Sequence, residues 1–411
     1  MRVYKIASFS LAIFLIAVLF AGVVTVPAAA QYGSTQFHYN AQHTGDYSPV
    51  AGSNASSGKL TWSFTTGAAV LSSPVVVNGV VYVGSDDNNV YALNATTGTK
   101  VWGYATGDEV YSSPAVANGV VYVGSDDSNV YAINATTGTK LWNYTTGNAV
   151  LSSPAVGNGT VYVGSDDNNV YAFNATTGAN TWSFTTSAAV LSSPAVANGV
   201  VFVGSEDNNV YALNANNGTK LWNYTTGNAV LSSPAVANGV VFVGSEDSNL
   251  YALNATTGAK LWNYRTGDGV YSSPAVANGT VYVGSDDNNT YAINATSGAK
   301  LWNYTAGSEV FSSPAVANGT VYVGSEDNNV YALNATTGKV TWNYTTGNEV
   351  LSSPAVANGV VYVGSEDNNV YAIGNAAAAT GATPALEVGL VFVGLVFVGL
   401  VIAAYVVRRK R

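Results

Sequence analysis

The chain has 411 residues, of which 47% are hydrophobic and only 9% are charged, and its formal net charge is −9. The hydrophobic content is that of a folded protein rather than a disordered one, and the negative charge is opposite to that of a nucleic-acid-binding protein. Cysteine is absent and only two histidines occur, which excludes disulfides, thiolate metal sites and a cysteine nucleophile and argues against a histidine-based catalytic triad.

The N-terminus is typical of a secretory signal. Arg2 and Lys5 precede a long apolar stretch, and Ala28-Ala29-Ala30 supplies small residues for cleavage. We therefore expect residues 1–30 to be a signal peptide, although the length of the apolar stretch leaves an uncleaved anchor as an alternative. A lead-in segment, residues 31–53, follows.

Residues 54–373 consist of one unit that is repeated eight times with a period of 40 residues. The motif Ser-Ser-Pro and the dipeptide Asn-Gly each recur once per unit. Self-similarity at this period is typical of propellers and solenoids. The tryptophans all obey the period and are Trp62, Trp102, Trp142, Trp182, Trp222, Trp262, Trp302 and Trp342.

Alternation of apolar and polar residues, interrupted by turn signals, predicts four short strands in each unit. We name them A to D from the axis of the propeller outward. Asn78-Gly79 is a strong hairpin signal between A and B, and polar turns separate B from C and C from D. Four antiparallel strands per unit predict a propeller blade. In the first unit the expected strands are 70–77, 80–85, 90–93 and 100–106.

The two ends of the repeat predict how the ring closes. Residues 60–65 form a D strand that lacks its A, B and C strands, and residues 350–373 form A, B and C strands that lack a D strand. Pairing the N-terminal strand with the last three removes an open sheet edge. We therefore expect an all-β, eight-bladed propeller of four-stranded antiparallel blades. The tryptophans lie on its outer strands, where they are expected to pack between blades, with a carbohydrate-stacking surface as the alternative.

The unit resembles the pyrroloquinoline-quinone-type (PQQ-like) propeller repeat, most clearly at residues 81–102, which read VYVGSDDNNVYALNATTGTKVW. The resemblance extends over residues 54–373, and the lead-in from Gln36 to Gly45 is similar to the segment that often precedes such repeats. It implies an eight-bladed propeller with tryptophans docked between blades. The family contains quinoprotein dehydrogenases and also non-enzymatic scaffolds, among them the lipoprotein of the outer-membrane β-barrel assembly machine.

The chain departs from the dehydrogenases of that family. They typically use a vicinal cysteine pair beside the quinone and catalytic acids in long insertions, whereas this chain has no cysteine and no insertion in any unit. Few residues differ between units: Tyr111, Tyr271 and Phe311 replace leucine, Ser187 replaces glycine and Arg265 replaces threonine. We assign no catalytic or cofactor-binding residue, and bound PQQ is not expected.

The C-terminus contains a second apolar segment. After a linker, residues 374–387, the uncharged residues 388–407 are long enough for a transmembrane helix, and the basic tail 408–411 is expected in the cytoplasm. The C-terminus also resembles an archaeal surface-protein sorting signal. It carries Pro384 but lacks the Gly-Phe pair of that signal, so retention as an anchor and cleavage with lipid attachment both stay open.

The charged residues divide between the two faces of the expected propeller. Because neighbouring strands run in opposite directions, the B–C turns and the D-to-A links share one face, and the A–B and C–D turns share the other. Each B–C turn carries two acids, whereas the lysines follow the C–D turns. The acidic ring is a candidate site for a weakly bound divalent cation, with Ca²⁺ as the expected ion, or for a basic partner, and ordinary turn chemistry is the alternative. Its residues are Asp86, Asp87, Asp126, Asp127, Asp166, Asp167, Glu206, Asp207, Glu246, Asp247, Asp286, Asp287, Glu326, Asp327, Glu366 and Asp367.

Asn-X-Thr sequons recur on the A–B turns, the C–D turns and the D strands. In a secreted chain each is a candidate N-glycosylation site, and the alternative is that the asparagine only caps a turn. The candidates are Asn94, Asn134, Asn143, Asn158, Asn174, Asn223, Asn254, Asn278, Asn294, Asn303, Asn318, Asn334 and Asn343.

These features together predict a single-pass protein of the cell membrane with an extracellular propeller and a cytoplasmic C-terminus. The last C strand runs towards the C–D turns, so the lysine-bearing face is expected to look towards the membrane. We expect a non-catalytic scaffold or envelope component that binds a protein or glycan partner, and no nucleic acid, through its acidic face. The alternatives are a quinoprotein (PQQ-dependent) oxidoreductase and a self-associating, surface-layer-like or adhesive protein.

Overall fold

The computed structural model describes residues 36–48, 55 and 57–374, which belong to one compact unit of the chain. All regular elements among these residues are β-strands. A search of this described part for an apolar helix long enough to cross a bilayer finds none. The predicted signal peptide, transmembrane span and basic tail lie outside the described residues.

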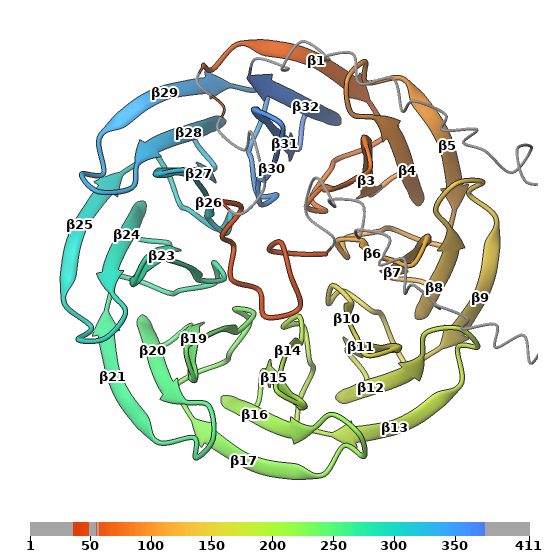
Figure 1. Ribbon diagram of the computed structural model, residues 1–411, viewed down its shortest axis with the longest axis horizontal. Coiled ribbons are helices and arrows are strands. Elements are labelled where there is room, and N and C mark those ends of the chain that lie inside the picture. The colour runs from red at the N-terminus through yellow and green to blue at the C-terminus, as the bar shows by residue number, and fades with distance from the viewer. Residues whose placement is uncertain (1–35, 49–54, 56, 375–411) are drawn as a thin grey trace, which may run out of the picture. The chain divides into compact units, whose positions relative to one another are not determined.

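The strands form eight sheets of four strands each, arranged as blades around a central axis (Figure 1). The all-β, eight-bladed propeller that the repeat predicts is therefore confirmed. The inner strands A are β2 (Val75–Val77), β6 (Ala115–Ala117), β10 (Ala155–Gly157), β14 (Ala195–Ala197), β18 (Ala235–Ala237), β22 (Ala275–Ala277), β26 (Ala315–Ala317) and β30 (Ala355–Ala357). The B strands are β3 (Val80–Ser85), β7 (Val120–Gly124), β11 (Thr160–Gly164), β15 (Val200–Gly204), β19 (Val240–Ser245), β23 (Thr280–Gly284), β27 (Thr320–Gly324) and β31 (Val360–Gly364).

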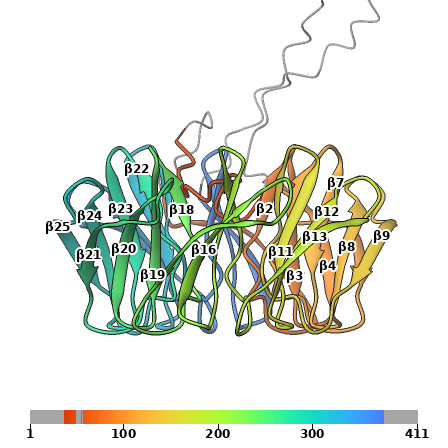
Figure 2. The ribbon, with the colours of Figure 1, turned by 90° about the horizontal axis from the view of Figure 1, so that it is seen from below.

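The two outer strands of each blade have six residues each. The C strands are β4 (Asn89–Asn94), β8 (Asn129–Asn134), β12 (Asn169–Asn174), β16 (Asn209–Asn214), β20 (Asn249–Asn254), β24 (Asn289–Asn294), β28 (Asn329–Asn334) and β32 (Asn369–Gly374). The D strands, at the periphery in Figure 1, are β1 (Leu60–Thr65), β5 (Lys100–Ala105), β9 (Lys140–Thr145), β13 (Asn180–Thr185), β17 (Lys220–Thr225), β21 (Lys260–Arg265), β25 (Lys300–Thr305) and β29 (Val340–Thr345). We number the blades 1 to 8 from β2, so that blade 1 is β2 to β5. The side view shows the turns gathered at two opposite faces (Figure 2).

The N-terminal strand closes the ring, as the ends of the repeat predict. Strand β1 pairs antiparallel with β32, with Trp62 opposite Ala372 and Thr65 opposite Asn369. Blade 8 therefore consists of β30, β31, β32 and β1. This arrangement covers the edge that β32 would otherwise expose.

The boundaries of three strands in the first unit differ from the prediction. Strand A begins at Val75 rather than at residue 70, because residues 70–74 form the link from the preceding blade, in which the Ser72 hydroxyl and the Ser73 N–H donate to the next blade. Strand D ends at Ala105 rather than at Thr106, whose N–H and hydroxyl both donate to Asn88 in the B–C turn. Strand C extends by one residue at each end, and strand B has the predicted bounds.

Local turn chemistry fixes the inner hairpin of each blade. In blade 1 both turn residues have positive φ, 51° at Asn78 and 78° at Gly79. Two positive φ values define the type I′ turn, whose twist matches that of the paired strands. The predicted Asn-Gly hairpin is therefore present.

Neighbouring blades contact each other through the tryptophans and through a glycine of strand B. The indole N–H of Trp102, in blade 1, donates to the carbonyl of Ala135 in blade 2 at 2.9 Å. A Cβ atom at Gly84 would lie 2.4 Å from the Val110 side chain and 2.5 Å from the Val110 carbonyl oxygen. Only glycine allows the backbone of blade 1 to approach the next link this closely.

The Ser-Ser-Pro motifs form a ring of hydrogen bonds around the axis. The backbone N–H of the second serine donates to the hydroxyl of the second serine one unit further on, as from Ser73 to Ser113 at 2.9 Å. The circle closes where Ser353 donates to Ser73, also at 2.9 Å. The motif therefore joins all eight blades, a role that its spacing alone did not reveal.

The lead-in segment lies in the central channel, where Figure 1 shows it within the ring of A strands. The middle residue of an A strand directs its N–H towards the axis, because its flanking residues make the hairpin hydrogen bonds. The carbonyls of Gln42, Thr44 and Gly45 accept these N–H groups from blades 5, 6 and 7 at 2.7–2.8 Å. The segment thus satisfies inner sheet edges that the propeller itself leaves open.

Candidate functional site: the acidic channel mouth

The second carboxylate of each B–C turn joins the turn to the preceding link by hydrogen bonds. In Asp87, Oδ2 accepts hydrogen bonds from the Gly67 N–H at 2.6 Å and the Tyr91 hydroxyl at 2.7 Å, and Oδ1 accepts one from the Asn89 N–H at 3.1 Å. Partial burial opposes ionisation of Asp87, but these hydrogen bonds outweigh it and hold the pKa below its ordinary value. Both carboxylate oxygens therefore accept hydrogen bonds from the protein. The second acid of each pair in the predicted cation ring has this structural role.

The first carboxylate of several pairs has a raised pKa instead of a lowered one. Burial, followed by the charges of Glu109, Asp126 and Glu366, raises the pKa of Asp86 to about 7. Burial and neighbouring carboxylates likewise raise the pKa of Asp126 to about 6 and that of Asp286 to about 7. Among the described residues, a buried Oδ1 atom that accepts no hydrogen bond occurs in Asp86, Asp126, Asp166 and Asp286.

A collar of half-buried apolar side chains accompanies these carboxylates. It consists of the residue before each Ser-Ser-Pro motif. Tyr271 and Phe311, from neighbouring links, have ring centroids 5.3 Å apart, so these two rings of the collar are in contact. The Tyr111 hydroxyl donates to Glu109. The members are Leu71, Tyr111, Leu151, Leu191, Leu231, Tyr271, Phe311 and Leu351.

The mouth is not eightfold symmetric. The D-to-A links before blades 2, 6, 7 and 8 carry additional acids, namely Asp108 with Glu109, Asp268, Glu309 and Glu349. The links before blades 1, 3, 4 and 5 carry asparagine or alanine at these positions. All three aromatic replacements in the collar fall on acid-bearing links. The links before blades 2, 6 and 7 therefore combine additional carboxylates with aromatic rings, whereas the links before blades 3, 4 and 5 are uncharged and aliphatic, although the B–C turns of those blades keep their acids.

The carboxylates do not gather into a chelating cluster. Within the described part of the chain, no three His, Asp or Glu side chains lie close enough together to hold a metal ion. The acidic pairs stand one per blade, and half of their carboxylates already accept hydrogen bonds from the protein. Calcium binding at the predicted ring stays a prediction.

The sequon asparagines fall into three structural settings. In the C–D turns, as at Asn94, Oδ1 accepts the backbone N–H groups of Thr96 and Thr97 at 2.9 and 3.0 Å. On the D strands, as at Asn143, the side chain donates to Asn129 on the neighbouring C strand at 2.9 Å. Asn158 belongs to a type I′ turn with φ of 51°. Each asparagine thus has a local structural role, and their glycosylation stays a prediction.

Two histidines of the lead-in segment are fully buried, His38 and His43. His38 stacks on Phe37 with ring centroids 5.0 Å apart, and the ring of His43 contacts Phe37 edge-on. Burial lowers the pKa of His38 to about 4 and that of His43 to about 3. Both rings are therefore neutral at physiological pH.

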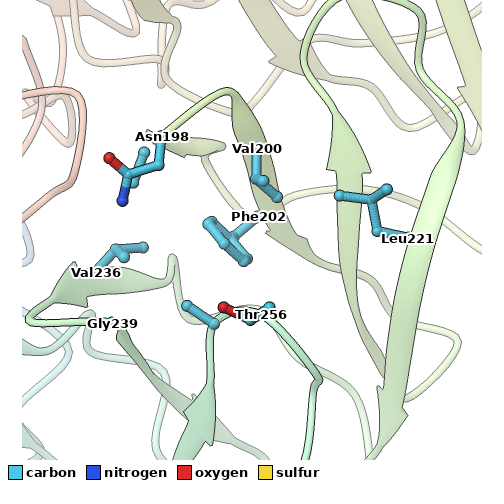
Figure 3. Close-up of a pocket in the computed structure, with 9 residues that line it drawn as sticks. Asn198, Val200, Phe202, Leu221, Val236, Gly239 and Thr256 are labelled. Atoms are coloured by element: carbon cyan, nitrogen blue, oxygen red, sulfur yellow. The ribbon is translucent and has the colours of Figure 1, made fainter.

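An inter-blade pocket lies on the opposite face, between blades 4 and 5, with a volume of about 300 Å³ (Figure 3). Phe202, on β15, lies within this pocket, and Ala255 lines it from blade 5. In blade 3 the corresponding Tyr162 donates its hydroxyl to the Ala215 carbonyl at 3.2 Å. Phenylalanine cannot donate, so the Ala255 carbonyl accepts from Trp222 alone, at 3.1 Å.

We expect Phe202→Tyr to raise the free energy of unfolding by about 1 kcal/mol, because the new hydroxyl would donate to Ala255 within an already formed pocket. Urea denaturation of the two proteins measures the change. The matched control is Tyr122→Phe, which removes the hydrogen bond from Tyr122 to Ala175 at 3.0 Å and should change stability by a similar amount in the opposite direction. A loss of stability in both variants would contradict this account of the interface.

Comparison with known proteins agrees with the architecture. The sequence profile described as "Outer membrane protein assembly factor BamB" matches residues 48–155, 126–235, 228–312 and 306–383. No curated protein sequence matches the chain.

Solved structures share the fold at low sequence identity. BamB from Moraxella catarrhalis superposes with a TM-score of 0.68 at 18% identity, covering 77% of this chain and 99% of its own. The computationally designed Ika8 protein gives 0.71 at 18% identity, over 77% of this chain and 100% of its own. Quinohemoprotein alcohol dehydrogenase from Comamonas testosteroni gives a TM-score of 0.72 at 16% identity, over 85% of this chain and 81% of its own. The profile covers most of the chain, and the chain therefore belongs to the BamB family of PQQ-like propeller repeat proteins.

Proposed function

We propose that the protein is a non-catalytic scaffold, anchored in the cell membrane by residues 388–407, that binds a basic partner at the acidic channel mouth. The observation that carries the proposal is the state of the first carboxylates. Asp86, Asp126 and Asp286 each have a buried oxygen without a hydrogen-bond partner among the described residues, and their pKa values are raised. A cationic group supplies the counter-charge and the hydrogen bonds that these oxygens lack.

The partner is expected to lie across the mouth, because Asp126 of blade 2 and Asp286 of blade 6 stand on opposite sides of the axis (Figure 1). The acid-bearing links bring Glu109 beside Tyr111 and place Tyr271 beside Phe311. Arginine and lysine side chains bind to carboxylates and also pack against aromatic rings. A basic protein segment therefore fits the acid-bearing links better than it fits the uncharged links before blades 3, 4 and 5.

The residues at the mouth do not fit the quinone of the alternative function. PQQ is a tricarboxylate, so its binding site needs cations or hydrogen-bond donors, whereas this mouth is lined with carboxylates. The described lysines stand at or directly before the first residue of a D strand, and Arg265 is the last residue of the outer strand β21. The dehydrogenases that share the fold do so at 15–18% identity, which is similarity of fold alone.

Affinity capture from native envelopes tests the proposal. The tagged full chain is compared with a mouth variant, Asp86→Asn with Asp126→Asn and Asp286→Asn, and with a control variant, Glu206→Gln, whose two adjoining links carry no acid. We expect a stoichiometric basic partner with the wild type and the control and at least a tenfold loss with the mouth variant. Equal capture by all three would refute the site, and recovery of the chain's own sequence alone would favour the self-associating alternative.

A further inference from the structure

The exposed large apolar side chains of the described residues are not scattered. There are seven of them, one in each blade except blade 3, and each directly follows a lysine in the sequence. Conversely, every described lysine precedes one of them. The pairs are Lys59–Leu60, Lys100–Val101, Lys140–Leu141, Lys220–Leu221, Lys260–Leu261, Lys300–Leu301 and Lys339–Val340. We call these fourteen residues the basic-apolar rim.

The members of each pair stay together even where the repeat shifts. In blades 7 and 8 the residue before the tryptophan is threonine, and the Thr341 hydroxyl donates to the Ala332 carbonyl at 3.0 Å. There the lysine and the aliphatic residue both move one position towards the N-terminus. In blade 3 the residue before the tryptophan is also threonine, Thr181, and Ala179 and Asn180 stand where blades 7 and 8 have the lysine and the aliphatic residue. The two residue types thus occur together or not at all, which points to a surface that uses both.

In blades 1, 2, 4, 5 and 6 a β-bulge explains why the aliphatic side chain is exposed, whereas in blades 7 and 8 the bulged residue is the threonine before the tryptophan. In blade 6, Lys300 pairs with Ile293 and Trp302 pairs with Ala292, so Leu301 has no partner on β24. A bulge of this kind turns the extra residue away from the regular alternation of the strand. Leu301 is 53% exposed, whereas the adjacent Trp302 is 9% exposed and packs between blades.

The rim lies where the chain leaves the propeller. It follows the C–D turns at the periphery, and β32 ends at the same face. The N–H of Gly374, the last described residue, donates to the Lys59 carbonyl at 2.7 Å, and its carbonyl accepts the Thr61 hydroxyl at 2.7 Å. The apolar segment begins at residue 388, so the intervening chain reaches at most about 50 Å. The opposite face carries the carboxylates.

We propose that the basic-apolar rim rests on the surface of an anionic lipid bilayer. The lysine ammonium groups would lie at the anionic headgroups, and the leucine and valine side chains would enter the interfacial layer. An anionic surface repels the carboxylate face, so the charge distribution favours the same orientation as the tether. This inference depends on the proposed membrane anchoring and does not depend on a partner at the channel mouth.

Fluorescence quenching in reconstituted vesicles tests the contact. The chain contains no cysteine, so a single introduced cysteine can carry a fluorophore in the full-length protein. Leu301→Cys places it on the rim, and Thr305→Cys places it at the other end of the same strand, β25. Nitroxide-labelled lipid is the quencher, in phosphatidylcholine vesicles with and without phosphatidylglycerol.

We expect quenching at residue 301 to exceed that at residue 305 several-fold in the anionic vesicles. Substituting Lys220, Lys260 and Lys300 with glutamine should remove most of this difference, as should omission of the anionic lipid. Equal quenching at the two positions, or stronger quenching at residue 305, would overturn the inference. Contact between rim fluorophores of different molecules in lipid-free detergent would overturn it too, because the rim would then pair two copies.

The capture experiment and the quenching experiment test the two proposals independently. Normal capture at the mouth with no quenching at the rim would refute the bilayer contact and leave the proposed function standing. Quenching at the rim with no dependence of capture on Asp86, Asp126 and Asp286 would refute the binding site and leave the bilayer contact standing.

Discussion

Gly84→Ala is expected to lower the free energy of unfolding by about 3 kcal/mol or more. The new Cβ atom would stand 2.4 Å from the Val110 side chain and 2.5 Å from the Val110 carbonyl oxygen. The carbonyl belongs to the backbone of the link and cannot move aside by a rotamer change. The blades must therefore separate at this point, which would also strain the ring of serine hydrogen bonds. Urea denaturation followed by tryptophan fluorescence measures the loss.

Gly103→Ala is the matched control for that substitution. A Cβ atom at Gly103, on β5 of the same blade, would meet its nearest atoms at 3.7 Å, which is ordinary van der Waals contact. We expect a change of less than about 1 kcal/mol, in the stabilising direction, because alanine restricts the unfolded chain. A loss of the same size in both variants would show that close packing between blades is not what position 84 requires.

Neighbouring carboxylates in one turn are expected to affect stability in opposite directions. Asp87→Asn should cost about 2 kcal/mol at pH 8, since an amide group would face the Gly67 N–H in place of a charged acceptor. Asp86→Asn should instead raise stability at pH 8, because it removes a partly buried charge that has like charges around it.

The stabilisation by Asp86→Asn depends on pH in a defined way. The pKa of Asp86 is raised to about 7 in the folded protein, above the ordinary value of 3.8. In the wild-type protein, the stabilising contribution of the protonated Asp86 carboxyl is therefore fully present below pH 4 and is lost as the pH rises towards 7. Asparagine does not titrate, so the variant does not lose stability in this way. The variant should melt several degrees above the wild type at pH 8 and at the same temperature at pH 4.

The control for this series is Glu206→Gln, at the corresponding position of blade 4, where the link carries Ala188 and Ala189 and no acid. We expect it to melt with the wild type at both pH values. A stability gain in Asp86→Asn that is the same at pH 4 and pH 8 would contradict the assigned cause of the raised pKa. So would a loss of stability in Asp86→Asn similar to that in Asp87→Asn.

Local features of the sequence were sufficient to predict the fold. The period of the tryptophans, the Asn-Gly turns and the unmatched strands at the two ends predicted eight blades and the pairing of β1 with β32. The error in strand A arose because residues 70–74 have strand-like composition, whereas the Ser72 hydroxyl and the Ser73 N–H donate their hydrogen bonds to the next blade. Hydrogen bonds between units are invisible in the alternation of a single unit.

The different states of the two carboxylates could not be predicted from the turn sequence. Asp86 and Asp87 are adjacent and chemically identical. Their difference depends on Gly67, which belongs to the preceding link, and on Glu109, which belongs to the following one. The course of the lead-in through the channel was missed for the same reason, since its partners, such as Val236, are far away in the sequence. A signal was present in the links, where acids and aromatic residues coincide at Tyr111, Tyr271 and Phe311.

Calorimetric titration of a lysine-rich peptide into the full chain, in detergent micelles, tests the acidic mouth most directly. The account predicts one peptide per propeller at pH 8 and an affinity about tenfold lower at pH 5, where Asp86, Asp126 and Asp286 are protonated. Binding should be lost in the variant with all three changed to asparagine and kept in Glu206→Gln. Binding of about eight peptides, or equal binding to the triple variant, would contradict the account, because the acids would then be an ordinary solvated surface.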